Sequence, residues 1–256
     1  MKLSGTVVLV TGASAGIGAA CARAFAAEGA RLVLAARRTE RLEALAEELR
    51  TAHASECHLV AVDVRDVGGV AQAVRGLPEG WGEIGVLVNN AGLGRGVDKV
   101  YAGEPEEWDE MLDTNVKGLL YVTRAVVPGM VERGRGHVIN LGSVAGHEVY
   151  PGGAVYCATK HAVDAITRGL RMDLLGTGVR VSTVDPGMVE SDFSVVRFRG
   201  DQARADKVYA GMTPLTPADV ADAVVWCATR PPHVNIDEII LKPTDQASAM
   251  QVHRQG

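Results

Sequence analysis

The sequence is poor in aromatic residues and has no run of like charges and no long apolar segment. Aromatic residues make up 4% of the 256 residues, whereas hydrophobic residues make up 47%. Aliphatic side chains must therefore build the core, which suits a sheet buried on both faces. With a net charge of -5 and no block of like charges, the composition argues against a nucleic-acid-binding face. The apolar runs are too short for a membrane span or a signal peptide.

The cysteines and histidines show no spacing typical of metal or redox sites. Cys21, Cys57, Cys157 and Cys227 lie far apart and form no CxxC pair, which argues against a zinc site and a disulfide framework. Reduced thiols of a cytoplasmic protein are the better interpretation, and we expect Cys157 to be buried and inert. The seven histidines also lack metal-binding spacing, so we predict no metal. We interpret His147 as a solvated loop residue.

Short apolar runs alternate with helical patterns along the whole chain. The runs are rich in Val, Ile and Leu and do not alternate with polar residues, as expected for buried parallel strands. This order predicts one α/β domain over 1–256: a Rossmann-like, doubly wound, parallel seven-stranded sheet with helices on both faces. The predicted strands are Thr6–Val10, Leu32–Ala35, Leu59–Val62, Ile84–Val88, His137–Leu141, Arg180–Val184 and Ile236–Leu241.

Helix signals and one irregular stretch lie between these strands. We expect Thr39 and Thr216 to be N-caps, and Asp219 follows the second of them by three residues. The stretch 187–214 reads as irregular, and its length is unusual for a loop in a compact domain. We interpret it as a lid over the substrate. The predicted helices are Ile17–Glu28, Thr39–Arg50 and Thr216–Ala228.

The first predicted strand runs into the glycine-rich segment TGASAGIG and then into a helix. Gly12 would permit a tight turn, Gly16 a close approach of backbone to a pyrophosphate, and Gly18 close packing of the helix. The phosphates would lie at the positive end of that helix. A turn with a packing glycine would explain the loop alone. Its position between a strand and a helix favours a dinucleotide site.

The end of the second strand discriminates between the two nicotinamide cofactors. An enzyme specific for NAD usually carries an acidic residue there, which accepts hydrogen bonds from the ribose 2′-hydroxyl. This chain instead has Arg37 and Arg38. Arginine at the start of a helix opposes the helix dipole, whereas it binds a phosphate well. We therefore predict NADP(H).

Three later segments add groups suited to proton transfer. Asn89-Asn90-Ala91-Gly92 ends the fourth strand, and Ser143 follows the fifth. Tyr156 and Lys160 are four residues apart in a helical stretch, so they share one face. A free tyrosine has a pKa near ~10, and a neighbouring ammonium group would lower it. A Tyr–Lys pair alone would be an ordinary helix-surface pair.

Together, TGASAGIG, NNAG, Asn115, Ser143 and YCATK resemble the short-chain dehydrogenase/reductase family in order and spacing, over almost the whole chain. The resemblance implies that Tyr156 is the general acid/base and that Lys160 lowers its pKa and binds the nicotinamide ribose. It implies that Ser143 orients the substrate and that Asn115 holds a proton-relay water. Asn115 could also be a buried helical asparagine bonded to the backbone, and the two interpretations are compatible.

The resemblance also implies which residues bind the cofactor. Asp63 and Val64 match the pair that contacts adenine, and Pro186-Gly187 matches the turn at the nicotinamide. Asp185 stands where relatives more often have Asn or Glu, and Asn89 is expected to tie the central strands together. The implied cofactor-binding residues are Gly12, Ser14, Gly16, Ile17, Gly18, Arg37, Arg38, Asp63, Val64, Asn90, Ala91, Gly92, Tyr156, Lys160, Pro186, Gly187, Val189 and Ser191.

Other segments resemble the NADP-dependent 3-hydroxy acid dehydrogenases of this family. The resemblance implies hydride transfer between NADP(H) and a small 3-hydroxy acid, or its semialdehyde or keto form, of the serine, allo-threonine and 3-hydroxypropionate class. It implies a homotetramer as well. The matching segments are Asp113–Asn115, Pro128–Arg133, Val196–Asp201, His233–Ile236 and Val252–Gln255.

Within these segments we predict that Arg197 anchors the substrate carboxylate and that Tyr150 lines the substrate pocket. A guanidinium matches both oxygens of a carboxylate. Two alternatives stay open: Arg197 could be a surface arginine paired with Asp192 or Asp201, and Arg199 could be the anchor instead.

Two other functions are compatible with the sequence. The protein could reduce other carbonyls, such as 3-ketoacyl thioesters or small aldehydes and ketones, although an acidic carrier partner would need a basic patch that a net charge of -5 does not suggest. It could also be a cofactor-binding regulator without catalysis, against which the complete set of catalytic residues argues.

Overall fold

A single parallel sheet forms the centre of the structure, a computed structural model that describes residues 3–255. Its seven strands have the order β3-β2-β1-β4-β5-β6-β7, and all their pairings are parallel. The chain winds outward from β1 in both directions, which confirms the predicted doubly wound fold. The strands are β1 Val7–Thr11, β2 Arg31–Ala36, β3 Cys57–Ala61, β4 Ile84–Asn89, β5 Gly136–Leu141, β6 Val179–Pro186 and β7 Glu238–Leu241.

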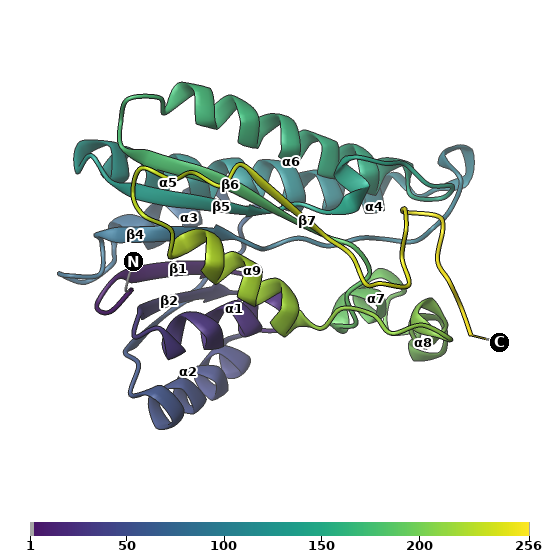
Figure 1. Cartoon of the computed structure of the whole chain (residues 1–256), viewed down its shortest axis with the longest axis horizontal. Coiled ribbons are helices and arrows are strands. Elements are labelled where there is room, and N and C mark those ends of the chain that lie inside the picture. Colours follow the sequence, from purple (N-terminus) through teal and green to yellow (C-terminus); the bar gives the residue numbers. More distant parts are fainter. Residues whose placement is uncertain (1–2, 256) are drawn as a thin grey trace.

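Helices cover both faces of the sheet (Figure 1). The first two helices and the last pack on one face, and α3, α5 and α6 pack on the other. The helices are α1 Gly16–Ala27, α2 Thr39–His53, α3 Val67–Arg75, α4 Pro105–Leu112, α5 Leu119–Glu132, α6 Ala154–Asp173, α7 Asp192–Arg197, α8 Gln202–Tyr209 and α9 Pro217–Ala228. Two 3-10 turns, η1 Val100–Ala102 and η3 Val144–Gly146, and a π-helical turn, η2 Asp113–Gly118, complete the set.

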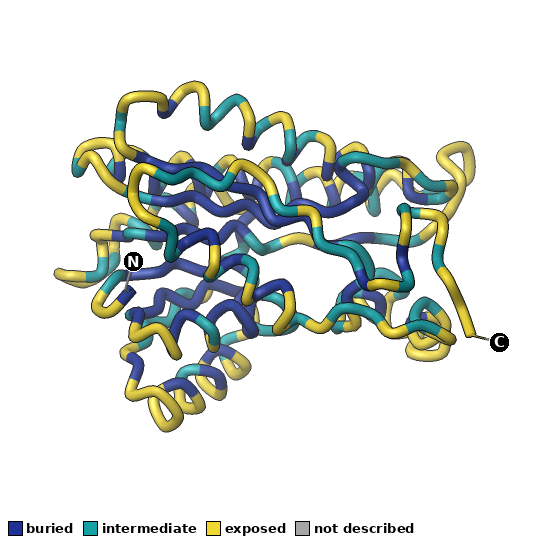
Figure 2. Tube along the Cα trace, in the orientation of Figure 1, coloured by how far each residue is buried: buried dark blue, intermediate teal, exposed yellow. Residues whose placement is uncertain are grey.

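Two aliphatic cores lie on the two faces of the sheet. Phe25 and Leu32 belong to the core under α1 and α9, and Leu87 and Met130 belong to the core under α5. Figure 2 shows the buried strands between helices whose outer sides are exposed. Full burial of such a side chain contributes about 1.5–3 kcal/mol, so a core with few aromatic residues suffices. Within residues 3–255, no helix has the length and apolar character needed to cross a membrane.

The two predicted N-caps have different outcomes. Thr216 caps α9 as predicted: its hydroxyl accepts from the Asp219 backbone at 3.3 Å, and the Asp219 carboxylate accepts from the Thr216 backbone at 2.7 Å. The prediction for α2 was wrong, because Arg38 occupies the N-cap position and its side chain makes no capping bond. That side chain is hydrogen-bonded to Ser14 instead.

The stretch 187–214 was wrongly predicted to be irregular, since it contains the short helices α7 and α8. Ser191 caps α7, and Asp201 caps α8 through bonds from the Phe193 and Arg204 backbones. Helices of six and eight residues are too short to show an apolar period, although both cap residues are visible in the sequence. Both helices lie beyond the ends of the strands (Figure 1).

Candidate active site

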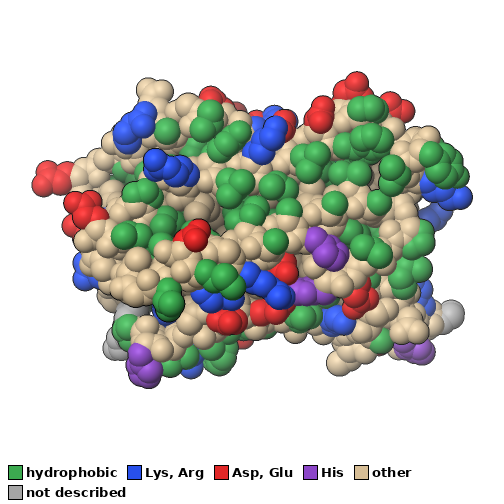
Figure 3. All heavy atoms as spheres, turned by 90° about the horizontal axis from the view of Figure 1, so that it is seen from above, with side chains coloured by type: hydrophobic (Ala, Val, Ile, Leu, Met, Phe, Trp, Pro, Cys, Tyr) green, Lys and Arg blue, Asp and Glu red, His purple; other side chains and the backbone are tan. Residues whose placement is uncertain are grey.

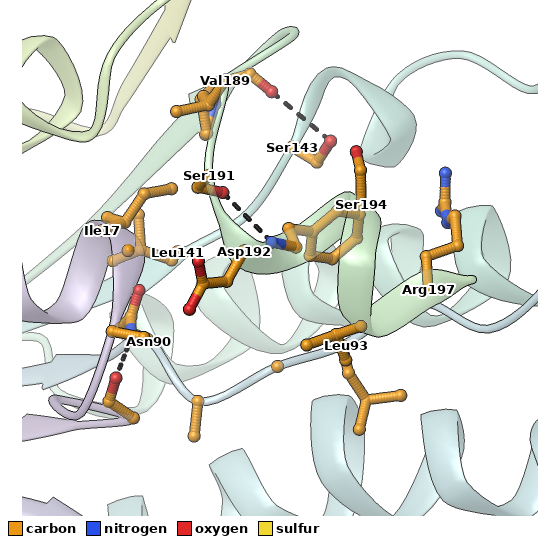
Figure 4. Close-up of a pocket in the computed structure, with 18 of the residues that line it drawn as sticks. Ile17, Asn90, Leu93, Leu141, Ser143, Val189, Ser191, Asp192, Ser194 and Arg197 are labelled. Carbon is orange, nitrogen blue, oxygen red and sulfur yellow. Dashed lines mark hydrogen bonds between the residues drawn. The ribbon is translucent and has the colours of Figure 1, made fainter. Parts of the chain in front are cut away.

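A cavity of about 510 Å³ opens where the strands end, beneath α7. This is the edge at which open parallel sheets bind ligands. Every predicted site residue lines it except Gly18 and Asn115. Figure 4 shows its length, with Ile17 and Asn90 at one end and Arg197 at the other, and α7 between them.

The glycine loop forms the wall at the first end. Gly12 and Gly16 have positive φ angles of 65° and 51°, which side chains rarely adopt. A Cβ on Gly18 would lie 2.4 Å from the Gly12 carbonyl oxygen, so glycine is needed for packing, as predicted. The N-terminus of α1 has no side-chain cap. Its free N–H groups and positive dipole suit a pyrophosphate.

Positive charges gather beside this loop. Arg38 donates from Nη2 to the Ser14 hydroxyl at 3.0 Å, and Arg37 lies 3.8 Å from the Asp63 carboxylate. Burial lowers the pKa of Arg38, and the neighbouring positive charge of Arg41 lowers it further. Asp63 is held mainly by Arg65, at 2.6 Å. A phosphate bound here would relieve the mutual repulsion of the arginines.

The predicted catalytic side chains meet midway along the cavity. Ser143 follows β5, and its hydroxyl donates to the Pro186 carbonyl at 3.4 Å. Tyr156 and Lys160 face the cavity from the first turns of α6. The Lys160 ammonium donates to the Leu141 carbonyl at 2.8 Å and lies 5.9 Å from the Tyr156 ring centre. The three groups thus surround one space.

The electrostatics of Tyr156 differ from the sequence-based expectation. Burial raises the pKa of its hydroxyl, and the strongest opposing influence is the positive charge of Arg197, followed by hydrogen bonding with Ser143. Burial also lowers the pKa of Lys160 to about 8. Arg197, which the sequence suggested only for substrate binding, therefore also favours the tyrosinate.

Asn115 lies outside the cavity, within the π-helical turn η2. Its amide donates to the Leu93 carbonyl at 2.8 Å and to Thr159 at 3.0 Å, and its oxygen accepts from the Leu93 backbone at 2.8 Å. The side chain therefore ties the loop after β4 to α6. The π-helical turn is a feature often found at functional sites, and the role of Asn115 in proton relay stays a prediction.

Arg197 closes the second end of the cavity. Its guanidinium lies 4.7 Å from the Tyr156 ring centre and 5.1 Å from that of Phe193. Nη2 donates to the Tyr150 hydroxyl at 3.0 Å. Among residues 3–255, no acceptor contacts the buried Nε atom of Arg197. The residue lines the cavity, and a buried charged donor without a partner is costly.

The two alternatives to this anchor are not supported by the contacts. Asp192 pairs with Arg41 at 3.1 Å and does not pair with Arg197. Arg199 lies in the exposed turn after α7 and pairs with Glu107 at 2.9 Å. Arg199 does not line the cavity.

Sequence reasoning missed several residues of the cavity. Phe193 packs on Tyr156 with ring centres 5.6 Å apart. Tyr209 of α8 donates to the Val189 carbonyl at 2.7 Å. Gln246, near the C-terminus, accepts from the Met188 backbone at 2.8 Å. The only signal in the sequence was their position within or after the predicted lid.

His147 is not the solvated loop residue that we predicted. Its Nε2 atom lies 2.9 Å from the Asp185 carboxylate and 2.9 Å from that of Glu238. These residues come from distant parts of the sequence, so no spacing could reveal the cluster. Asn89, by contrast, has the predicted structural role, donating to Asn140 at 2.9 Å and to Thr123 at 3.0 Å.

These features define a dinucleotide-binding α/β protein with a tyrosine placed for proton transfer. The short chain dehydrogenase family model matches residues 6–201. NADP-dependent 3-hydroxy acid dehydrogenase of Salmonella typhi is 49% identical and covers 97% of this chain and 99% of its own. Sulfoacetaldehyde reductase of Chromohalobacter salexigens is 46% identical over 94% of each chain. The closed form of serine dehydrogenase complexed with NADP+ has a TM-score of 0.91 at 46% identity, covering 98% of this chain and 100% of that one.

The chain belongs to the short-chain dehydrogenase family, as its motifs indicated. The similarity to the Salmonella typhi relative extends over 97% of the chain.

Proposed function

We propose that the protein is an NADP-dependent oxidoreductase that interconverts a small 3-hydroxy acid and its semialdehyde or keto form. The observation that carries this proposal is the Arg197 guanidinium, which lines the cavity 4.7 Å from the Tyr156 ring centre and whose buried Nε has no acceptor among the described residues. A carboxylate would supply that acceptor. The similarity to an NADP-dependent 3-hydroxy acid dehydrogenase and to serine dehydrogenase supports the same substrate class.

The cavity fits NADP(H) along its length. The uncapped start of α1 suits the pyrophosphate. Arg37 and Arg38 line the same end, and among residues 3–255 neither forms an ion pair closer than 3.8 Å, so they are available to a 2′-phosphate. Lys160, Pro186 and Gly187 line the region expected to hold the nicotinamide half. The bound nicotinamide gives or takes the hydride.

Tyr156 handles the proton in this mechanism. In reduction its hydroxyl donates a proton to the substrate oxygen, and in oxidation the tyrosinate takes the proton back. The Ser143 hydroxyl holds the same substrate oxygen in place. The positive charge of Arg197 opposes the effect of burial on the pKa of Tyr156, and the Lys160 ammonium lies 5.9 Å from the Tyr156 ring centre.

Arg197 and Tyr150 would bind the other end of the substrate. The Tyr150 hydroxyl accepts one bond from Arg197, so its own proton is free for a carboxylate oxygen. A small acid has few atoms, and this contact would fix which carbon faces the nicotinamide.

The test compares the acid with its neutral methyl ester in Arg197→Ala. Loss of a charged hydrogen bond should lower kcat/KM for the acid by a factor that corresponds to ~1.5–3 kcal/mol. The value of kcat/KM for the ester should stay nearly unchanged. Arg199→Ala, on the same segment but paired to Glu107, is the matched control and should affect neither substrate. Equal losses for acid and ester would rule out Arg197 as the anchor.

A second candidate substrate is an aldehyde that carries a sulfonate. The unpaired Arg197 Nε suits any small anion, and sulfoacetaldehyde reductase is similar over nearly the whole chain. A panel of carboxylated, sulfonated and neutral carbonyls with NADPH separates these substrates. Steady oxidation of NADPH with any of them would also exclude a regulator without catalysis.

We further propose that 187–214 is a mobile lid, that the protein is a cytoplasmic homo-oligomer, and that a tetramer is its preferred state. All four cysteines are free thiols, as suits a reducing compartment. Met172, Leu175 and Trp226 are exposed apolar side chains, and in Figure 3 apolar groups spread over much of the visible face. Such surface favours association, and light scattering would measure the mass of the assembly.

A further inference from the structure

One buried carboxylate beside the reacting groups has no part in the mechanism above. The Asp185 side chain, near the end of β6, is only 3% exposed. Thr183 donates to its Oδ1 atom at 2.6 Å, and His147 Nε2 lies 2.9 Å from its Oδ2 atom. A buried carboxylate is costly without such partners. The fold therefore stabilises a negative charge at this position.

This carboxylate lies against the segment that holds two catalytic groups. A Cβ on Gly142 would be 1.7 Å from the Asp185 Oδ1 atom, so the carboxylate fills the space beside that backbone. Leu141, the residue before Gly142, accepts the bond from the Lys160 ammonium at 2.8 Å. Ser143, the residue after it, carries the hydroxyl proposed to hold the substrate.

Lys160 has no direct anionic partner. Among residues 3–255, no carboxylate forms an ion pair with its ammonium. Burial lowers its pKa to about 8, and the negative charge of Asp185 acts in the opposite direction. Without that charge, more of Lys160 would be neutral near physiological pH.

We propose that Asp185, held by His147, is a positioning residue whose negative charge keeps the buried Lys160 cationic for catalysis. The inference rests on the proposed oxidoreductase function, but on no particular substrate. Asp185 acts through Lys160 and does not itself reach the reacting atoms.

Several charged groups surround the Asp185 carboxylate. Burial raises the pKa of Asp185 to about 6, against the hydrogen bonds from Thr183 and His147, which lower it, and together with hydrogen bonding to Glu238, which raises it. Asp185 is therefore anionic above about pH 6, throughout the range in which Lys160 titrates. The groups that face the pair are Tyr156 and Arg168 of α6, His147 of the loop after η3, and Glu238 of β7.

The sign of the effect is clearest in the reduction direction. The rate should fall at alkaline pH, when Lys160 loses its charge and Tyr156 its proton. Removing the Asp185 charge makes the ammonium easier to deprotonate. This change moves the alkaline limb of the pH–rate profile to lower pH.

The test compares two neutral isosteres at the carboxylates that share His147. With any carbonyl that the unmutated protein reduces, Asp185→Asn should move the alkaline limb of kcat/KM down by about one pH unit. Glu238→Gln removes the other carboxylate and should leave that limb in place, because the negative charge that raises the pKa of Lys160 is that of Asp185. Asp185→Ser is a second neutral variant with less bulk, and circular dichroism and Tm verify folding of each protein.

The outcomes are distinct. A lower alkaline limb in Asp185→Asn or Asp185→Ser, with Glu238→Gln unchanged, supports the proposal. A rate that falls equally at every pH, or an equal displacement in Glu238→Gln, overturns it and leaves Asp185 a structural residue. An unmutated protein that reduces no carbonyl contradicts the proposed function instead, so the two failures are distinguishable.

Discussion

Different chemical groups line the two ends of the cavity. At the expected cofactor end, backbone forms much of the wall: Gly12 and Gly16 adopt positive φ angles, and the start of α1 presents free N–H groups. At the proposed substrate end, side chains from separate segments converge, with Arg197 between Tyr156 and Tyr150. The first end offers shape and a helix dipole to a ligand, and the second offers one positive charge.

This difference implies different sensitivity to mutation. Backbone sites tolerate changes in nearby side chains, since N–H groups and the helix dipole remain. A site made of few buried side chains depends on each of them, because a lost partner leaves the other group buried and unsatisfied. Mutations at each end can therefore test whether the two ends differ in this way.

The largest effect on turnover is expected at Tyr156, where the two ends of the cavity meet. Tyr156→Phe keeps the ring that packs on Phe193 but loses the transferable proton. Turnover should fall by ~10²–10⁴-fold, whereas the Kd for NADPH should stay nearly unchanged. Stopped-flow rates and a fluorescence titration measure the two quantities. A variant with near-normal turnover would show that another group donates the proton.

At the cofactor end, the arginines should govern the choice between NADP and NAD. Arg37→Ala and Arg38→Ala each remove a charged donor near the expected 2′-phosphate, at a cost of ~1.5–3 kcal/mol. KM for NADPH should therefore rise much more than KM for NADH. Arg65→Ala, whose side chain is bound to Asp63, is a control with the same loss of charge nearby. Equal use of both cofactors by the unmutated protein would refute the assignment.

At the substrate end, Tyr150→Phe should have a smaller effect than loss of Arg197. The ring stays, and one neutral hydrogen bond is lost, which is worth about 0.5–1.5 kcal/mol. KM for the acid should rise, with little change in kcat and none for NADPH. Initial rates with both substrates varied give these constants. If kcat falls instead, Tyr150 contributes to the chemistry and not to binding alone.

The sequence predicted well the features that depend on residues close together in the chain. The strands, α1 and α9 follow from apolar runs and caps, because each depends on residues close in sequence. Gly12 and Gly16 lie between β1 and α1, and Arg38 directly follows β2, so their shared position at the ends of two consecutive strands is visible in the sequence. The parallel, doubly wound arrangement of the sheet also follows from the alternation of strand and helix.

The remaining features depend on contacts between distant segments. Phe193 meets Tyr156, and His147 meets Asp185 and Glu238, only after the sheet is assembled. The electrostatic influence of Arg197 on Tyr156 has the same origin. No local pattern encodes these contacts, so sequence reasoning could name Arg197 as a candidate but could not place it.

The smallest expected effect concerns the lid, where the two ends are joined. Within α7 only Ser194 is buried, and within α8 only Ala205, whereas seven residues of α1 are buried. Segments with few buried contacts open at low free energy, so amide exchange in 192–209 should be fast in the free protein. Asp192 at the start of α7 pairs with Arg41, and Arg197 at the end of α7 is hydrogen-bonded to Tyr150 at the proposed substrate end of the cavity.

NADPH and the acid substrate should therefore each slow amide exchange in the proposed lid, 187–214, one after the other. NADPH alone should protect the start of α7, and the acid should add protection only when cofactor is present. In Arg197→Ala the first step should remain and the second should disappear, since the acid loses its contact with the helix. Hydrogen exchange read by mass spectrometry resolves both steps, with α1 as the internal reference. Identical protection in all states would mean that 187–214 is a fixed wall, and that the two ends of the cavity act independently.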